Sequence, residues 1–180
     1  MATQRRDGVV MESHTTQDLT TRLQRVRLLL MDCDGVLTDG RLYFGPSGEE
    51  LKVFHVRDGQ GIVAWHAAGF RSGIISGRNS SIVEMRGSQL GVEFIRQGID
   101  DKVAVLDEIA AAAGVGYDQI AFIGDDTPDI PVLELVGLGT AVADAVDEVK
   151  AAAHLITIKK GGRGAVRELI DLILASKSSV

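Results

Sequence analysis

Two aspartates separated by one residue follow a short apolar run, and they are the first residues in the chain that could do chemistry. Asp32 and Asp34 come directly after Leu28–Met31, in the segment MDCDGVLTDG. On an extended backbone, side chains two positions apart point to the same side, so the two carboxylates would lie together. Gly35 then allows the chain to turn. The spacing predicts a carboxylate centre at the end of a buried strand.

Three further segments contain polar residues that suit phosphate or metal chemistry, each at the end of an apolar run or at the start of a helical pattern. They are Ser76-Gly77-Arg78 after an apolar pair, Lys102 at the start of a helical pattern, and Gly124 to Asp129 after another apolar run. Ligands of open α/β sheets bind at the carboxyl ends of the strands. We therefore expect carboxylates, a hydroxyl and an ammonium group at one edge of a sheet.

Carboxylates brought this close would repel each other and raise each other's pKa unless a cation lay between them. Clustered oxygens without suitable Cys or His partners favour Mg²⁺, which also accepts phosphate oxygens. With the ion screening the phosphoryl group, Asp32 could attack phosphorus and form an aspartyl phosphate. Asp34 could protonate the leaving alcohol and later deprotonate water, while Ser76 and Lys102 would hold the other phosphoryl oxygens.

Strand and helix patterns alternate along about 150 residues and would position these groups. The expected strands are Leu28–Met31, Ile74–Ile75, Val92–Ile95, Ile120–Ile123, Leu138–Val142 and His154–Thr157. The expected helices are Gly61–Ala68, Ser80–Leu90, Asp101–Ala113, Pro128–Leu135, Ala145–Ala152 and Ala165–Ala175, with Ser80 and Asp100 as N-caps. This alternation predicts a Rossmann-like, doubly wound, mostly parallel α/β sheet with helices on both faces.

One segment interrupts the alternation. Residues 41–56, RLYFGPSGEELKVFHV, have alternating apolar residues around a Gly-Pro-Ser-Gly turn and predict a projecting β-hairpin. The hairpin fills the space between Asp34 and Gly59, and one helix and one strand fill the space between Ser76 and Lys102, so we expect no cap domain. Residues 1–18 are polar with little periodicity and are expected to be a mobile lead-in to a single domain at 19–180.

Composition narrows the function classes. The 180 residues carry a formal charge of −6, which disfavours nonspecific binding to nucleic acid or to anionic membranes. Cys33 is the single cysteine, so neither an intramolecular disulfide nor a cysteine-based zinc site can form, and a reducing cytoplasm fits. Because no apolar run suits a secretory signal or a membrane span, we expect a soluble protein that is not exported.

Taken in order, the four polar segments resemble the motifs of the haloacid dehalogenase superfamily of phosphatases. The family pattern DxDGV[LT]T[DE] is matched by residues 32–39, the hydroxyl motif by Ser76-Gly77, the lysine by Lys102, and GDDxxD by residues 124–129. The resemblance implies Asp32 as nucleophile, Asp34 as acid/base, and Mg²⁺ held by Asp32, the Asp34 backbone carbonyl and Asp125. It implies that Asp126 and Asp129 support these direct ligands or bind the metal through a water molecule.

A narrower resemblance, over about residues 28–175, is to the 3-deoxy-D-manno-octulosonate 8-phosphate phosphatases. It is carried by the segments TDGRLYFGPSGEELKVFHVRDGQGI, SGRNSSIVEMRGSQLGV and GGRGAVRELIDLIL. It implies a homotetramer in which hairpins form a central barrel and a neighbouring subunit covers each site. Arg78 would then lie over the sugar, Arg86 would reach in from the neighbour to the substrate carboxylate, and the loop 159–164 would contribute to the site.

Three alternatives stay open. A phosphatase of the same architecture could act on a nonulosonate 9-phosphate or on a broader range of sugar phosphates, although such nonulosonate enzymes tend to carry an acid where this chain has Arg78. A regulatory receiver domain would only accept phosphate on aspartate, usually on a third strand, whereas Asp32 ends the first. A noncatalytic oligomerisation module would form tetramers without hydrolysis, which the presence of Asp34 and Lys102 disfavours.

Overall fold

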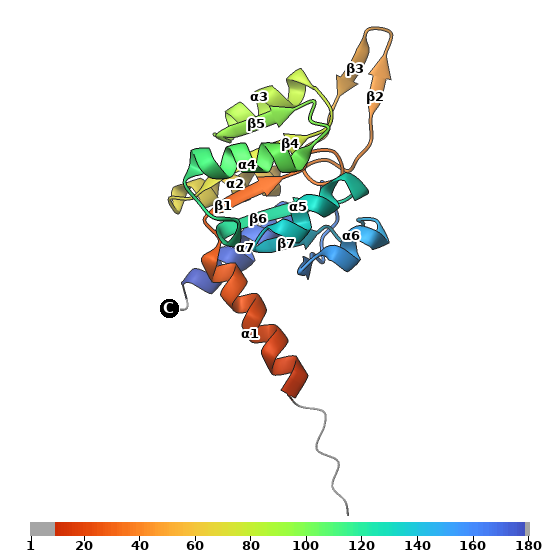
Figure 1. Ribbon diagram of the computed structural model, residues 1–180. Coiled ribbons are helices and arrows are strands. Elements are labelled where there is room, and N and C mark those ends of the chain that lie inside the picture. Colours follow the sequence, from red (N-terminus) through yellow and green to blue (C-terminus); the bar gives the residue numbers. More distant parts are fainter. Residues whose placement is uncertain (1–9, 179–180) are drawn as a thin grey trace, which may run out of the picture.

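A six-stranded sheet, all of whose paired strands run parallel, forms the centre of the computed structural model, which describes residues 10–178 (Figure 1). The strand order is β5-β4-β1-β6-β7-β8. The strands are β1 (Leu28–Met31), β4 (Arg71–Ser76), β5 (Phe94–Gln97), β6 (Ile120–Gly124), β7 (Leu138–Ala141) and β8 (Leu155–Ile156). The chain leaves β1 in one direction and later returns across it to β6. This reversal confirms the predicted doubly wound sheet and opens a binding edge beside β1.

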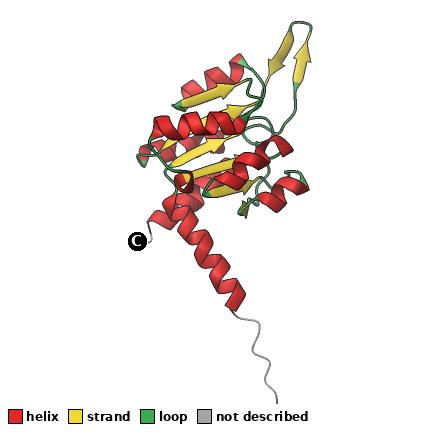
Figure 2. Ribbon diagram, viewed as in Figure 1, coloured by secondary structure: helices red, strands yellow, loops and turns green. Residues whose placement is uncertain are grey.

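Helices cover both faces of the sheet (Figure 2). They are α1 (Val10–Arg25), α2 (Val56–Ala67), α3 (Ser81–Gln89), α4 (Lys102–Ala113), α5 (Ile130–Leu135), α6 (Asp147–Ala152) and α7 (Ala165–Lys177). On one face α7 packs between α1 and α2, and on the other α5 packs between α4 and α6. None of the helices in the described part of the chain is long and apolar enough to cross a membrane.

The core explains why the central strands are apolar on both faces. Every residue of β1 and β6 is buried, because helices cover the sheet from both sides. Trp65 of α2 and Phe122 of β6 are among the largest fully buried side chains, and the Trp65 indole also donates to the carbonyl of Arg71 at 2.7 Å. The short apolar runs therefore become interior strands that fix where each polar terminus lies.

The predicted hairpin is present and projects from the end of the sheet at which the strands finish (Figure 1). Its strands β2 (Tyr43–Gly45) and β3 (Gly48–Leu51) pair antiparallel. Apolar side chains along it are exposed, including Leu42 at 38%, Phe44 at 63% and Val53 at 52%. Within residues 10–178 no cap domain occurs at either insertion point, as predicted, so the hairpin is the main projection over the binding edge.

The starts of α1 and α2 differ from the predictions by several residues, whereas α4, α5 and α6 begin one or two residues later than expected. The expected mobile lead-in extended to about residue 18, but α1 begins at Val10, so the second half of that segment is helical; residues 1–9 lie outside the described part. The helix is anchored near its end, where Arg22 donates to the carbonyl of Gly137 at 2.7 Å; Asp18, one turn earlier in the same helix, pairs with Arg22 at 2.9 Å. The polar composition of residues 10–18 gives little apolar periodicity, so the sequence pattern did not reveal this helix.

The other early start is α2, which begins at Val56 and not at Gly61. His55 caps this helix by accepting from the Arg57 backbone, and Gly61 lies where α7 approaches: a Cβ there would meet the Arg167 Cα at 3.1 Å. Glycine lowers helix propensity, but this close packing compensates. In α4 the N-cap is Asp101, which accepts from the Val103 and Ala104 backbones, so the expected Asp100 cap is wrong by one residue.

A buried carboxylate ties α2 to the start of α7. Asp58 is 1% exposed and accepts hydrogen bonds from the backbone N–H groups of Gly164 at 3.1 Å and Arg167 at 2.9 Å. Gly164 offers no side chain to cap α7, so Asp58 supplies the cap from another helix. The loop before α7 is thereby fixed against the rest of the domain.

Replacing Asp58 with alanine is expected to lower the free energy of unfolding by about 2 to 3 kcal/mol, because two buried N–H groups lose a charged acceptor. Urea unfolding followed by circular dichroism measures this. The matched control is Asp171→Ala, which removes the exposed pair of Asp171 with Arg167 and should cost about 0.5 kcal/mol or less. Equal losses in both variants would contradict the assigned capping role.

Candidate active site

A cavity of about 320 Å³ opens at the carboxyl ends of β1, β4 and β6. It is lined by most of the residues singled out from the sequence: Asp32, Asp34, Ser76, Gly77, Arg78, Lys102, Asp125, Asp126 and Asp129. Arg86 is not among the lining residues, and its guanidinium lies beside Gly59 of α2. The fold thus brings together side chains from segments almost one hundred residues apart, at the carboxyl ends of the strands, where open α/β sheets bind their ligands.

Lys102 joins two carboxylates at the base of the cavity. Its Nζ donates to Oδ1 of Asp32 at 2.8 Å and to Oδ1 of Asp129 at 2.6 Å. All three residues are buried, with 7% of Asp32, 7% of Lys102 and 1% of Asp129 exposed. Burial alone would lower the pKa of Lys102, but Asp32 and Asp129 raise it, so the ammonium form persists.

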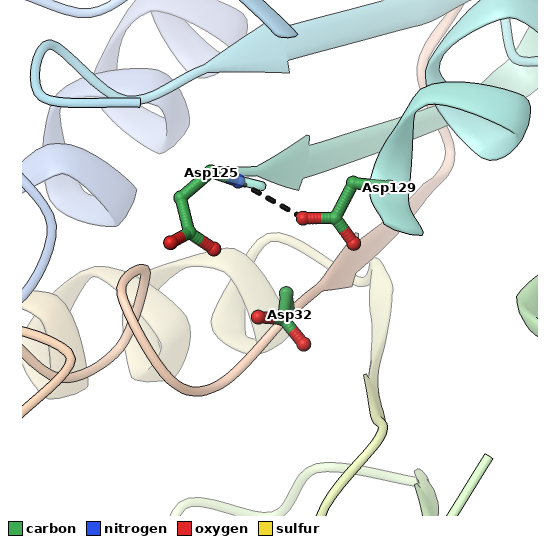
Figure 3. Close-up of side chains that lie close together, drawn as sticks. All are labelled: Asp32, Asp125 and Asp129. Atoms are coloured by element: carbon green, nitrogen blue, oxygen red, sulfur yellow. Dashed lines mark hydrogen bonds between the residues drawn. The ribbon is translucent and has the colours of Figure 1, made fainter. Parts of the chain in front are cut away.

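Asp129 has both oxygens engaged by protein groups. While Oδ1 accepts from Lys102, Oδ2 accepts from the Asp125 backbone N–H at 2.9 Å, as Figure 3 shows, and lies 3.4 Å from the Asp126 backbone N–H. Asp126 is exposed and accepts from the Thr127 backbone at the start of the short 3-10 helix η2 (Thr127–Asp129). These two residues hold the loop after β6 in shape, while the indirect or water-mediated role toward the metal expected for them stays a prediction.

If ionised together, the carboxylates of the cavity would carry an excess of negative charge. Burial raises the pKa of Asp32 to about 6, with Lys102 opposing that rise and Asp129 adding to it. Burial also raises the pKa of Asp125 to about 8, and repulsion from Asp32 and Asp129 contributes further. One lysine cannot neutralise this group, so the cavity is electrostatically suited to a cation.

The geometry fits a hard divalent ion. Asp32, Asp125 and Asp129 can each offer an oxygen such that all three lie within 4.8 Å of one another (Figure 3). Asp125 Oδ1 is buried and has no hydrogen-bond partner within the described residues. Oxygen-only donors and a net negative charge match the preference of Mg²⁺. Since both oxygens of Asp129 already accept hydrogen bonds, Asp32 and Asp125 are the side chains best placed as direct ligands.

Close backbone packing holds the loop after β1 against Asp125. Gly35 has φ of +93°, and a Cβ at this position would lie 2.0 Å from Asp125 Oδ2. On the other side, the Gly162 N–H donates to the carbonyl of Val36 at 2.8 Å, and a Cβ at Gly161 would collide with the Gly35 carbonyl. The loop 159–164 thus packs against the loop after β1, and its own residues do not line the cavity.

Asp34 meets two cationic side chains. Its Oδ1 accepts from the ammonium of Lys52, and its Oδ2 lies 3.6 Å from Nε of Arg78. The Arg78 guanidinium also lies over the Phe44 ring of the hairpin, 5.8 Å from its centroid. Sequence reasoning did not single out Lys52: it lies in a segment that carries the narrower resemblance, but outside the four catalytic motifs, and a lysine next to a hairpin strand is normally solvated.

Ser76 is buried at the end of β4, and its Oγ accepts weakly from the Arg78 backbone N–H at 3.4 Å. Gly77 follows at the rim of the same cavity. The structure therefore brings Ser76, Gly77 and Arg78 to the carboxylates, while the roles expected for them stay predictions. Arg86 does not line the cavity of its own subunit, and its expected role in a neighbouring subunit's site stays a prediction.

Comparison with known proteins points to one family. Residues 72–169 match the family model of haloacid dehalogenase-like hydrolases. The chain is 44% identical to the 3-deoxy-D-manno-octulosonate 8-phosphate phosphatase of Yersinia pestis, over 91% of this chain and 87% of that protein. It is 40% identical to the phosphatase of the same name from Escherichia coli strain K12, with the same coverage.

Solved structures give the same result. The crystal structure of the Yersinia pestis phosphatase superimposes with a TM-score of 0.88 at 45% identity, covering 89% of this chain and 87% of that one. The enzyme of the same name from Moraxella catarrhalis, crystallised with a magnesium ion, a phosphate ion and KDO, has a TM-score of 0.88 at 36% identity. That superposition covers 91% of this chain and 94% of the other.

Metal-free protein is expected to lose stability as the pH rises from 5 to 8. Asp125 has a folded-state pKa of about 8, above its ordinary value of 3.8, so the folded state holds a proton that the unfolded chain releases in this window. Folding that binds extra protons is weakened by raising the pH. Thermal unfolding in a chelator measures the slope.

In Asp125→Asn the same slope should be shallower, because the ionising group is gone. Added Mg²⁺ should raise the melting temperature of the unmodified protein most at pH 8 and should have little effect on the variant. An unchanged slope in Asp125→Asn, or equal stabilisation of both proteins by Mg²⁺, would contradict the assigned charge excess and metal site.

Proposed function

The chain belongs to the haloacid dehalogenase-like hydrolases, and we propose that it hydrolyses 3-deoxy-D-manno-octulosonate 8-phosphate (KDO 8-phosphate) to KDO and phosphate, with Asp32 as nucleophile. The observation that carries the proposal is the cavity in which Asp32, paired with Lys102, lies beside Asp34 and Asp125. Relatives that cover nine tenths of this chain bear the name of that phosphatase. Residues 19–180 form the proposed catalytic domain.

In the first step, a carboxylate oxygen of Asp32 attacks phosphorus. A bond forms between Asp32 and phosphorus while the bond from phosphorus to the sugar oxygen breaks, and Asp34 donates a proton to that oxygen as it leaves. The Lys102 hydrogen bond keeps Asp32 in place and favours its ionised form. The Ser76 hydroxyl and the Lys102 ammonium stabilise the remaining phosphoryl oxygens.

The second step returns the enzyme to its starting state. Asp34, now ionised, removes a proton from water, and the water oxygen attacks phosphorus as the bond to Asp32 breaks. Inorganic phosphate leaves, and Asp34 again carries the proton that it needs for the next alcohol. The position of Asp34 at the cavity wall supports both transfers.

Magnesium would be held by Asp32, Asp125 and the backbone carbonyl of Asp34. When bound it supplies positive charge that reduces repulsion between the carboxylates and the phosphate and polarises the phosphoryl group. Lys102 positions Asp32 by donating a hydrogen bond to it, and Asp129 positions the backbone of Asp125; neither Lys102 nor Asp129 would itself be a direct ligand.

The sugar would be recognised at the cavity rim. Arg78 is exposed there and carries the positive charge that suits an acidic sugar. Nonulosonate 9-phosphate phosphatases, by contrast, tend to carry an acidic residue at this position. We propose a homotetramer in which exposed apolar residues of the hairpins pack together and Arg86 of a neighbour contacts the substrate carboxylate. We also propose that the enzyme acts in the cytoplasm, where it would catalyse a step in the synthesis of lipopolysaccharide precursors.

The alternatives agree less well with the cavity. A receiver domain needs only an acceptor aspartate, whereas Asp34 here lies where it can activate water. A noncatalytic oligomerisation module has no use for the buried arrangement of Asp32, Lys102 and Asp129. Replacing a buried ion-pair network with well-packed apolar residues is often neutral or stabilising, so a module that only assembles gains no stability from these three charged side chains.

Phosphate release should be Mg²⁺-dependent, and kcat/KM for KDO 8-phosphate should exceed that for nonulosonate 9-phosphates and simple sugar phosphates. Asp32→Asn should lose at least about 1,000-fold in kcat, since no nucleophile remains, while keeping its circular dichroism spectrum. Asp147→Asn, at a fully exposed side chain, is the matched control and should retain activity. Preference for another substrate in the panel would refute the KDO 8-phosphate assignment.

Introducing a charge on the hairpin should dissociate the proposed tetramer. Leu42→Glu places a carboxylate among the exposed apolar hairpin side chains, so light scattering should report smaller species and kcat/KM should fall as the neighbour's contribution is lost. Leu135→Glu, at an equally exposed residue at the end of α5, should change neither quantity. A monomer with full activity would rule out the shared site.

A further inference from the structure

Lys52 is a buried cation at the base of the hairpin, outside the motifs that define the chemistry. It follows β3 directly, and its side chain has no exposed surface. Its neighbours in sequence, Leu51 and Val53, are about half exposed. Burying an ammonium group is unfavourable unless a partner compensates for the lost hydration. Asp34 is a compensating partner: its Oδ1 accepts a hydrogen bond from Lys52 Nζ.

This contact makes the two oxygens of Asp34 unequal. Oδ1 is occupied by Lys52, whereas Oδ2 is buried with no hydrogen-bond partner within the described residues. Arg78 is the nearest cation to Oδ2, but its Nε lies 3.6 Å away, which is too long for a hydrogen bond. An ammonium group donates only and accepts nothing. A proton on the Asp34 carboxyl is therefore directed to Oδ2.

We propose that Lys52 is a positioning residue for proton transfer: by donating to Oδ1 it fixes the Asp34 carboxyl so that Oδ2 exchanges the proton with the leaving alcohol and later with water. The inference rests on the proposed phosphatase function and adds a residue to it. General acid catalysis needs the acid within hydrogen-bond reach of the oxygen that it protonates. A carboxyl free to rotate would present the protonated oxygen in other directions.

A purely structural role for Lys52 makes a different prediction. If Lys52 only anchored the hairpin, its loss would disturb binding and chemistry for every substrate. If Lys52 acts through Asp34, its loss matters most where the leaving group needs a proton. An alkoxide from a sugar alcohol needs that proton, whereas nitrophenolate leaves readily without one.

The test compares kcat/KM for KDO 8-phosphate with kcat/KM for p-nitrophenyl phosphate. This parameter covers the steps up to aspartyl phosphate formation, and the ratio of the two values does not depend on how much of the variant is correctly folded. In Lys52→Met the ratio should fall by about 10- to 100-fold, part of the usual contribution of a general acid. Lys52→Arg, which keeps a donor, should recover part of the loss.

The double variant separates action through Asp34 from other effects. In the Asp34→Asn background, where the ratio is already low, Lys52→Met should lower it no further. Lys150→Met, a surface control on α6, should leave the ratio unchanged. Equal losses for both substrates in Lys52→Met, or a further fall in the Asp34→Asn background, would overturn the proposal.

Failure of the proposed function gives a different result. If the unmodified protein releases phosphate from p-nitrophenyl phosphate and from another sugar phosphate but not from KDO 8-phosphate, the substrate assignment fails. The ratio is then measured with the accepted sugar phosphate, which has the same kind of leaving group. Lys52 is assessed by the same criteria in that case.

Discussion

Excess negative charge at one edge of the sheet is the constraint on which the rest of the structure depends. Asp32 and Asp125 come from strand ends that the sheet places next to each other, and one ammonium group, Lys102, lies between Asp32 and Asp129. Burial, together with the repulsion that remains, raises the pKa of Asp125 strongly. A site with full internal neutralisation would be more stable without metal and would attract neither a cation nor a phosphate bound to it.

The surrounding structure holds this unfavourable arrangement in place. Asp129 uses one oxygen for Lys102 and the other for the backbone of the Asp125 loop, so a lysine from α4 and a loop after β6 share one support. The loop after β1 is held between Asp125 and the segment before α7, and Asp58 fixes that segment from α2. Groups that repel each other thus remain close because contacts from several elements oppose their separation.

Much of this was predictable from the sequence, and the reason is the coupling of apolar runs to polar ends. The run Leu28–Met31 matches β1 in full, because a buried strand in a parallel sheet needs apolar residues on both faces. Helix starts were less predictable: α2 runs from Val56 through Gly59 and Gly61, and the close approach of α7 at Gly61 is a tertiary effect. Lys52 could not be found, since its burial depends on how the hairpin meets Asp34, and no local pattern encodes that approach.

The hairpin has two sides with different demands. Its outer side chains are apolar and exposed, while the residue at its base reaches the carboxyl group of Asp34. A change in the shape of this ribbon would therefore reach in two directions, outward to any surface packed on it and inward to the Asp34 carboxyl group. If the proposed roles hold, substitutions in the ribbon would affect both the chemistry and the assembly, although none of its residues lies in the four motifs that carry the catalytic groups.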